Sequence, residues 1–325
     1  MDHIRTFMER HYRHFNARET REAAVAYEAH VTAGGKMLLA MAGAMSTGEL
    51  GVSLARMIGE GKVHAISCTG ANLEEDVFNL LAHEEYETIP DWTSLTAEDE
   101  AELYRRGMNR VTDTCIPADV MRHVEQRLVE GWRSACETGA RRSPWEFLVD
   151  MLRAGALEEH YQIDPSTSWV LAAMHAGIPV YTPGWEDSTM GNIFAANVIS
   201  GVIPHHGCVQ SGTEQFQHLI EWYLENDGRT DGLPAPGFFQ IGGGIAGDFA
   251  ICAVPCIVQD LKRDTQPWGY FAQITDATAS YGGYSGAVPN EKITWGKLTT
   301  ETPRFSIHSD ASIVAPLIFS YVLGD

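Results

Sequence analysis

The 325-residue sequence lacks any long apolar run. No stretch approaches the roughly 20 consecutive apolar residues that a membrane-spanning helix needs. The first residues, MDHIRTFMERHYRHF, are charged and aromatic, whereas a secretory signal would have an apolar centre there. We therefore expect a cytosolic protein that has no membrane partner.

Cysteine is scarce, and basic residues are outnumbered. The six cysteines form no CxxC pair, which disfavours both a disulfide framework and a zinc ribbon and favours reduced, mostly buried thiols. The chain has 43 acidic and 23 basic residues, a formal charge of −20. A nucleic-acid partner is disfavoured, because phosphate recognition depends on Lys and Arg. The charge favours a cationic partner only slightly, because many acidic proteins bind no cation.

Several motifs of common enzyme classes are also missing. There is no GxSxG nucleophile turn, no GxxxxGK[ST] phosphate loop and no complete GxGxxG. His205, His206 and Cys208 offer zinc-like ligands in PHHGC, but a partnering CxxC or helical HxxxH is absent. Structural roles are the better interpretation of these three residues, and we predict no metal site.

What is present is an alternation of strand-like and helical patterns from about residue 36 to the end, without repeats or linkers. It predicts one α/β domain over residues 1–325, with a short helical segment at about 1–32. Strand, small-residue turn and helix follow one another in KMLLAMAGAMSTGELG, VHAISCTGANLEED, AGIPVYTPGWEDSTMGNIF and PGFFQIGGGIAGDFAICAV. Ligands of open parallel sheets bind at the carboxyl ends of the strands, so these turns are expected to converge on one crevice.

Two further local predictions concern the helices. Glu74 to Asp76 are expected to lie at the start of a helix, where carboxylates complement the helix dipole. Residues 85–165 are helical in pattern and rich in charge, and Trp92, Trp132 and Trp145 are expected to anchor their packing. This middle third is interpreted as scaffold.

Three features are candidates for chemistry. The Gly242–Gly244 turn would let backbone amides approach a pyrophosphate, although glycines also serve tight turns. Lys297 lies beside Trp295 after a Gly-rich loop, a setting that suits partial burial, and burial favours the neutral amine that attacks a carbonyl or imine carbon. A surface lysine is the alternative. Four carboxylates near strand ends could hold ammonium groups or a ribose hydroxyl, or could cap helices: Asp187, Asp248, Glu291 and Asp310.

The segments SGAVPNEKITWGK, SDAS, the GGG turn and CTGANLEED closely resemble those of deoxyhypusine synthases and of the bacterial deoxyhypusine synthase-like proteins. The resemblance runs from about residue 36 onward, and its PxExxxWGK pattern is its most specific part. It implies a Rossmann-like parallel sheet flanked by helices, a homotetramer with active sites at subunit interfaces, and bound NAD. The implied reaction transfers an aminobutyl group from a polyamine such as spermidine to an amine acceptor through an imine on Lys297, in a dry pocket.

The resemblance also implies roles for individual residues. The cofactor contacts fall on Gly43, Ala44, Met45, Ser46, Thr47, Thr69, Gly70, Ala71, Glu75, Asp187, Gly243, Asp276, Ala277, Asp310 and Ala311. The amine contacts fall on Glu74, Glu291 and Trp295, and the amine site includes the departing positions Asn192, Asp248 and Tyr284. Glu291 would pair with an ammonium group while the Trp295 ring faces the amine chain.

Those three departures all lie on the amine side. Asp248 stands where the synthases carry a histidine, and Asn192 and Tyr284 stand where they carry aspartates. Two anchoring charges for a spermidine-like cation are therefore lost, and a carboxylate replaces an imidazole that titrates near neutrality. A changed donor or acceptor is expected.

Four functions stay open on the sequence. The leading hypothesis is an NAD-dependent transferase that acts on a small polyamine or guanidino-amine, with a free amine as acceptor, as in homospermidine synthesis. The second is an authentic deoxyhypusine synthase that modifies a lysine of a translation factor. The third is an NAD-binding protein with weak or lost catalysis, and the fourth is a simple dehydrogenase.

Overall fold

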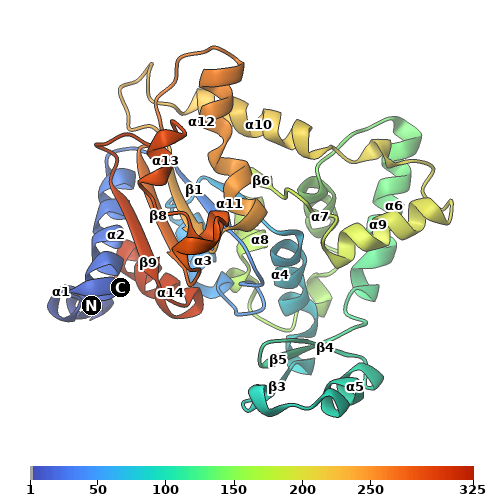
Figure 1. Ribbon diagram of the computed structural model, residues 1–325. Helices are drawn as coiled ribbons and strands as arrows, with labels where there is room; N and C mark the ends of the chain where they lie inside the picture. Colours follow the sequence, from blue (N-terminus) through green and yellow to red (C-terminus); the bar gives the residue numbers. More distant parts are fainter. Residues whose placement is uncertain (1–2) are drawn as a thin grey trace.

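The computed structural model describes residues 3–325, apart from the side chain of His123, and has an α/β architecture built on a six-stranded parallel sheet. The strand order is β6-β2-β1-β7-β8-β9 (Figure 1). The predicted α/β class and parallel sheet are confirmed. The strands are β1 (Met37–Met41), β2 (Ala65–Cys68), β6 (Val180–Tyr181), β7 (Gly237–Ile241), β8 (Tyr270–Thr275) and β9 (Arg304–His308).

The sheet is buried on both faces, which explains why its strands are continuous apolar runs. All five residues of β1 are buried. Met37, Leu39 and Met41 belong to one core cluster, whereas Leu38 and Ala40 belong to another on the opposite face. The period of two along a strand thus divides a single apolar run between two cores.

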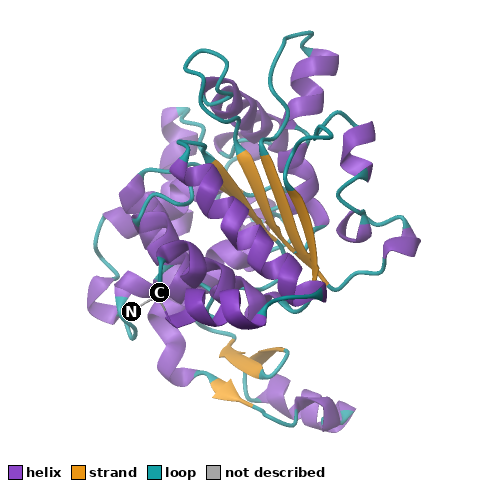
Figure 2. Ribbon diagram, turned by 90° about the vertical axis from the view of Figure 1, so that its left-hand side faces the viewer, coloured by secondary structure: helices purple, strands orange, loops and turns teal. Residues whose placement is uncertain are grey.

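Helices cover both faces of the sheet (Figure 2). The core that contains Leu39 also contains side chains from α2 (Phe15–Thr32), α3 (Gly51–Gly59), α8 (Trp169–Ala176) and α14 (Ala311–Leu323). The core that contains Leu38 is closed by α10 (Gly212–Glu225), α11 (Gly244–Ile251) and α12 (Ala253–Pro255). The predicted opening helical segment consists of α1 (His3–His11) and α2, of which α2 packs against β9 and α14.

The strand register brings the carboxyl ends of the strands to one edge. Met41 at the end of β1 pairs with Cys68 of β2 and with Ile241 of β7. Thr275, the last residue of β8, pairs with His308, the last residue of β9. The turns that follow these strands therefore start side by side, as the sequence predicted.

The middle third contains a small sheet that the helical prediction missed. Strands β3 (Glu87–Thr88), β5 (Thr114–Pro117) and β4 (Met108–Val111) pair antiparallel in that order, and with α5 (Ala97–Arg105) they project from the main body (Figure 1). Longer helices follow, α6 (Arg122–Thr138) and α7 (Pro144–Arg153). The prediction that this whole third is helical was therefore wrong.

The three tryptophans of this third differ in burial. Trp132 and Trp145 are buried in the core and contact the scaffold as expected. Trp92 is 37% exposed, and the Arg110 guanidinium lies 5.8 Å from its ring centroid. Trp92 is thus a surface ring beside the small sheet, and its prediction as a packing anchor was wrong.

The carboxylates Glu74 to Asp76 also lie elsewhere than predicted. Helix α4 (Gly70–Ala82) begins at Gly70 with Thr69 as its cap, so the first turn contains no acidic residue. Both oxygens of Glu74 accept backbone N–H groups from the start of α9 (Thr189–Ile199). Asp76 accepts a hydrogen bond from the Val170 N–H at the start of α8. These carboxylates therefore complement the N-termini of neighbouring helices rather than that of their own.

No helix among residues 3–325 is long and apolar enough to cross a membrane. The division of the chain into domains stays a prediction.

Candidate functional site

Every predicted cofactor residue except Glu75 lies on a turn or helix start that follows one of the six parallel strands, and Glu75 lies in the second turn of α4. The turns follow β1, β2, β7, β8 and β9, and the sixth, after β6, carries Asp187. The register described above places them along one edge of the sheet, which we call the cofactor edge. The structure therefore brings together residues that span positions 43 to 311 of the sequence.

The turn after β1 is held rigidly by Asn72. Ser46 donates its N–H to Asn72 Oδ1 at 3.0 Å and its hydroxyl to the Asn72 carbonyl at 2.6 Å. Trp169 Nε1 donates to Ser46 Oγ, and Asn72 also donates to the Gly43 carbonyl. Gly43 has φ of +68°, a conformation that favours glycine. Ser46 therefore supports the turn from within, and its role as a cofactor contact stays a prediction that this geometry does not favour.

Adjacent residues Glu74 and Glu75 have different surroundings. The Glu74 carboxylate is occupied by the Thr189 and Met190 N–H groups, at 2.8 and 2.7 Å, so its predicted amine contact would compete with the cap of α9. Glu75 is also buried, and its Oε2 and the Thr47 hydroxyl make no well-formed hydrogen bond among the described residues. Burial raises the pKa of Glu75 to about 7, and the nearby hydroxyl and N–H of Thr47 oppose this shift. Glu75 and Thr47 thus retain bonding capacity for a ligand.

The turn after β7 depends on glycine at position 243. A Cβ on Gly243 would lie 2.2 Å from the Ser285 hydroxyl oxygen, which no real contact allows. Ser285 Oγ accepts a hydrogen bond from the Gly244 N–H at the start of α11. The glycine therefore lets the loop after β8 close over the helix N-terminus, a backbone arrangement that suits phosphate groups.

The remaining carboxylates of the cofactor edge are exposed. Ser188, and not Asp187, caps α9 by accepting the Gly191 N–H. Asp276 directly follows β8 and is exposed. Asp310 is the cap of α14, because its Oδ1 accepts both the N–H and the hydroxyl of Ser312. Helix capping thus explains Asp310, while the side chains of Asp187 and Asp276 face solvent.

Lys297 is buried, which excludes the surface alternative left open by the sequence. It is 7% exposed and lines a cavity of about 580 Å³, which we call the lysine cavity. Its Nζ donates to Asp248 Oδ1 at 3.4 Å. The Trp268 N–H donates to the Lys297 carbonyl, so the backbone lies beside the start of β8 while the side chain reaches toward α11. A nearly enclosed amine with a carboxylate beside it is a competent nucleophile arrangement.

Tyr284 forms a wall of the lysine cavity. The Lys297 ammonium lies 5.6 Å from the centroid of the Tyr284 ring, and the Tyr284 hydroxyl donates to Gln240 Oε1 at 2.7 Å. Burial raises the pKa of Tyr284, so the phenol stays neutral. A Cβ on Gly247 would lie 2.9 Å from this ring, and glycine there therefore allows α11 and the ring to pack together. The other side of this wall faces a broad apolar groove lined by Ile245 and Phe249.

Lys292 is a residue of this site that the sequence analysis missed. It is 2% exposed and lines the lysine cavity. Its Nζ lies 4.8 Å from the centroid of the Tyr284 ring. Burial and the charge of Lys297 lower its pKa to about 8. It lies in the four-residue helix α13 (Glu291–Thr294). From the sequence alone, a lysine in such a segment is expected to be exposed to solvent. The one feature of the sequence that could have pointed to Lys292 is its closeness to Lys297, which follows it by five residues.

The other predicted amine contacts have mixed positions. Glu291 and Trp295 line the lysine cavity and are exposed, and Lys297 Nζ lies 5.8 Å from the Trp295 ring centroid. Asn192 donates to the backbone carbonyls of Glu186 and Ser188, so its amide fixes the turn before α9. Asn192 is absent from the residues that line this cavity, and its substrate contact stays a prediction.

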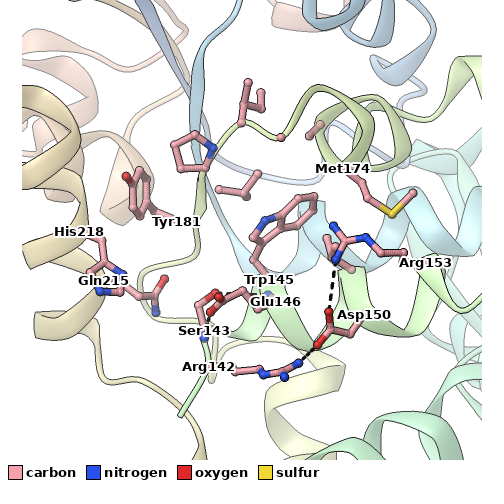
Figure 3. Close-up of a pocket in the computed structure, with 16 residues that line it drawn as sticks. Arg142, Ser143, Trp145, Glu146, Asp150, Arg153, Met174, Tyr181, Gln215 and His218 are labelled. Carbon is pink, nitrogen blue, oxygen red and sulfur yellow. Dashed lines mark hydrogen bonds and ion pairs between the residues drawn. The ribbon is translucent and has the colours of Figure 1, made fainter. Parts of the chain in front are cut away.

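A second cavity lies beside the edge strand β6, away from the predicted residues. Its volume is about 550 Å³, and Trp145, Tyr181 and Gln215 lie around it (Figure 3). Asp150 forms ion pairs with both Arg142 and Arg153 at its border (Figure 3). None of the residues predicted for the site lines this cavity.

The PHHGC segment is held by ordinary contacts. His205 Nδ1 accepts the Gly207 N–H, and the ring of His206 packs on Phe194. Cys208 is buried. Among residues 3–325, no group of three His, Cys, Asp or Glu side chains is arranged to hold a metal ion. Cys68, Cys115 and Cys208 are buried free thiols, whereas the other three cysteines are partly exposed.

Sequence comparison agrees with this geometry. The family model for deoxyhypusine synthase matches residues 7–322, and the chain belongs to the deoxyhypusine synthase family. A deoxyhypusine synthase-like protein from Thermosynechococcus vestitus is 28% identical over 303 residues, which cover 88% of this chain and 69% of that protein. The Archaeoglobus fulgidus protein named "Probable deoxyhypusine synthase 1" is 25% identical over 317 residues, which cover 95% of this chain and 90% of that protein.

A solved structure shares the fold. A crystal structure from Entamoeba histolytica, of a protein assigned as a deoxyhypusine synthase, superposes with a TM-score of 0.55 at 12% identity. The superposition covers 94% of this chain and 87% of that one. The predicted family is thus confirmed, and membership in it fits an aminobutyl transferase.

Proposed function

We propose that the protein is an NAD-dependent transferase that moves an aminobutyl or related alkylamine group from a polyamine-like donor to an amine acceptor through an imine on Lys297. The observation that carries the proposal is the burial of Lys297 in a cavity, with Asp248 at 3.4 Å from its Nζ. The exclusion of water matters, because water would hydrolyse an imine before the acceptor arrives.

The proposed chemistry uses the neutral amine of Lys297. Its Nζ forms a bond to the imine carbon of the oxidised donor while the bond from that carbon to the departing amine breaks. The proton lost by Nζ passes to the departing amine, and Asp248 is the neighbouring group that can hold it in transit. The Tyr284 and Trp295 rings face the Lys297 ammonium and would stabilise its charged form between turnovers.

The cofactor edge fits a dinucleotide. Glu75 Oε2 and the Thr47 hydroxyl are buried without a well-formed hydrogen bond, and a ribose hydroxyl would provide one. The start of α11 is exposed at Gly244, whose N–H donates to Ser285 Oγ, so a pyrophosphate that binds there would replace that contact. When bound, NAD would supply hydride acceptance from the donor carbon and its later return to the product. The chain's own residues orient the donor between this edge and Lys297.

The altered amine site supports a donor or acceptor other than the standard pair. Tyr284 is neutral and bonded to Gln240, and Asn192 is bonded to backbone, so neither provides a charge for a polyamine. Besides Asp248, which is paired with Lys297, Glu291 and Asp260 are exposed carboxylates that line the lysine cavity. A small polyamine or guanidino-amine donor and a free amine acceptor form the proposed pair, and homospermidine synthesis shares with it only the transfer to a free amine.

A homotetramer is part of the proposal. Exposed apolar side chains lie near both parts of the site, among them Ile245 at 53%, Trp295 at 60% and Ile313 at 62%. Subunit contacts there would bury them and dry the cavity. Light scattering on the purified protein tests this assembly, and a monomer at micromolar concentration would contradict it.

The first test is intact mass after incubation with NAD and a panel of polyamines and guanidino-amines, followed by borohydride. The wild type is expected to gain a stable amine-derived mass, and Lys297→Ala is expected to gain none. Lys62→Met, which changes a lysine far from the site before β2, is the matched control and should gain the same mass as the wild type.

The same reactions separate the alternatives. Net accumulation of NADH would indicate a dehydrogenase, because a transferase returns the hydride. Retained NAD without any adduct would indicate a binding protein. Transfer only to a translation-factor lysine would indicate an authentic deoxyhypusine synthase.

A further inference from the structure

Lys292 is the most deeply buried charge of the lysine cavity. It is 2% exposed, compared with 7% for Lys297. An ammonium group has three N–H donors. Among the described residues one acceptor is recorded for Lys292 Nζ, the Ala287 carbonyl at 3.2 Å. The rings of Phe271 and Tyr284 lie at 5.0 and 4.8 Å from Nζ to their centroids. The charges of Lys297, Glu291 and Asp248 also act on Lys292, without a hydrogen bond or ion pair to it among the described residues.

The cavity therefore holds a cation whose hydrogen-bonding capacity is unfilled. Lys297 has the Asp248 carboxylate as its ion-pair partner, whereas no ion pair of Lys292 is found within residues 3–325. A buried ammonium without a carboxylate destabilises a fold, and a methionine would fill the same space without that cost. The lowered pKa of Lys292, about 8, reflects this cost and leaves the group largely charged at neutral pH.

The charges of the cavity are also ordered in space. Three exposed carboxylates line the cavity, Asp248, Asp260 and Glu291, of which Asp248 is paired with Lys297, whereas the two lysines are buried. A ligand with an ammonium group at each end would place one of them against Lys292. A ligand with an ammonium group at one end and an oxygen acid at the other would complement both the exposed carboxylates and the buried Lys292.

We infer that Lys292 binds the acid group of the acceptor, and that the lysine cavity takes an acceptor amine that also carries a carboxylate, as an ω-amino acid does. This inference rests on the proposed function, because the acceptor must reach the imine on Lys297. There, the acceptor nitrogen forms a bond to the imine carbon, the bond from that carbon to Lys297 Nζ breaks, and the proton of the acceptor amine returns to Nζ. Lys292 fixes the other end of the acceptor and is a specificity residue.

The test is calorimetric binding at pH 7 to the full chain with NAD present. The probes are ω-amino acids of three to six carbons, each matched to the alkylamine and the diamine of the same length. The best amino acid is expected to bind roughly tenfold or more tightly than its matched amines, as one charge-assisted contact permits. Lys292→Met is expected to bring this ratio close to one, and Lys62→Met to leave it unchanged. A ratio near one in the wild type, a preference for diamines, or a preference that survives in Lys292→Met would overturn the inference.

A second measurement needs no variant. The wild-type preference for the amino acid should decline as the pH rises through about 8, where Lys292 loses its charge. The other titratable groups that line the cavity are Lys297, Asp248, Asp260, Glu291, Tyr284, Cys252 and Cys256, so the matched alkylamine is measured in parallel to remove their contribution. A preference constant from pH 7 to 9.5 would contradict the assignment.

Binding and catalysis are read out separately. Borohydride trapping with a donor tests the imine on Lys297, whereas calorimetry reports the carboxylate contact in the absence of a donor. Absence of any trapped adduct would contradict the proposed function while the affinity ratio still decides the role of Lys292.

Discussion

The cofactor edge and the lysine cavity differ in which of their buried groups lack hydrogen-bond partners. At the cofactor edge, Glu74, Asp76 and Asp310 are bonded to helix N-termini, and the unfilled groups are Thr47 and Glu75. In the lysine cavity the unfilled group is a cation, Lys292. In the function proposed above, the first region would hold the hydroxyl and phosphate groups of NAD, and the second would serve acid–base chemistry on amines. Relative to deoxyhypusine synthases, we therefore expect the lysine cavity to alter substrate choice, whereas the cofactor edge is expected to keep cofactor binding.

The largest effect expected at an acid–base residue follows removal of the carboxylate beside Lys297. Asp248→Asn is expected to lower the single-turnover rate of imine formation by roughly 10²- to 10³-fold, since general acid–base catalysis contributes on this order. NAD retention should be unchanged, because Asp248 contacts Lys297 and not the cofactor edge. A variant that loses NAD and rate together would show that the two regions are not separable.

Next in size are two stability effects of opposite pH dependence. Lys292 has a folded pKa of about 8, below its ordinary 10.5, so its cost to the fold is complete below pH 8 and disappears between 8 and 10.5. Lys292→Met is therefore expected to raise the free energy of unfolding by about 1–3 kcal/mol at pH 7, and by progressively less above pH 8. Denaturant titrations at pH 7 and pH 10 measure this, and destabilisation at pH 7 would contradict it.

The pH dependence of stability that we expect for Glu75 is the reverse of that for Lys292. Its folded pKa of about 7 lies above the ordinary 4.5, so its cost grows as the pH rises from 4.5 to 7 and is complete above 7. Glu75→Gln is expected to stabilise the protein without NAD by about 1–3 kcal/mol at pH 8 and by little at pH 4.5, while weakening NAD binding. Thermal unfolding with and without NAD separates the two effects, and stabilisation that is equal at both pH values would rule out this cause.

A stability effect of similar size is expected where the turn after β7 approaches Ser285 at the cofactor edge. Gly243→Ala places a methyl group 2.2 Å from Ser285 Oγ and must displace the loop after β8. We expect a loss of about 1–3 kcal/mol of stability and a weaker affinity for NAD. Gly212→Ala, where the added methyl group meets open space at the start of α10, is the control. Equal behaviour of the two variants would show that Ser285 does not hold the turn.

The smallest effect concerns the cap of α9. Ser188→Ala removes the bond to the Gly191 N–H and is expected to cost about 1 kcal/mol, with activity unchanged. Asp187→Ala is the paired variant. It should leave stability unchanged and weaken NAD binding if Asp187 contacts the cofactor. Loss of stability in Asp187→Ala instead would mean that capping, and not ligand contact, is its role.

The parallel sheet was predictable because its strands are apolar runs followed by small-residue turns, as in β1 and β7. The small antiparallel sheet was not, because its strands have two to four residues and expose polar side chains such as Glu87 and Asn109. No alternation of polarity can be recognised over such lengths. Its pairing is set by tertiary contacts that the sequence pattern does not contain.

The site was predictable in part for similar reasons. The WGK pattern identified Lys297, and the strand-to-turn transitions located the cofactor edge. The burial of Lys292 depends on how α13 lies over Phe271, a contact between segments that are distant in the sequence. The occupation of Glu74 by the start of α9 likewise joins positions 74 and 190, so no local pattern could separate its role from that of Glu75.

The measurement that tests the central claim most directly is the position of the trapped adduct. Two buried lysines line the same cavity, so intact mass alone does not distinguish them. The borohydride-treated protein is cleaved with a protease that does not depend on lysine, and the modified peptide is sequenced by mass spectrometry. The account predicts the amine-derived mass on Lys297 in both the wild type and Lys292→Met. An adduct on Lys292, or one retained in Lys297→Ala, would contradict it.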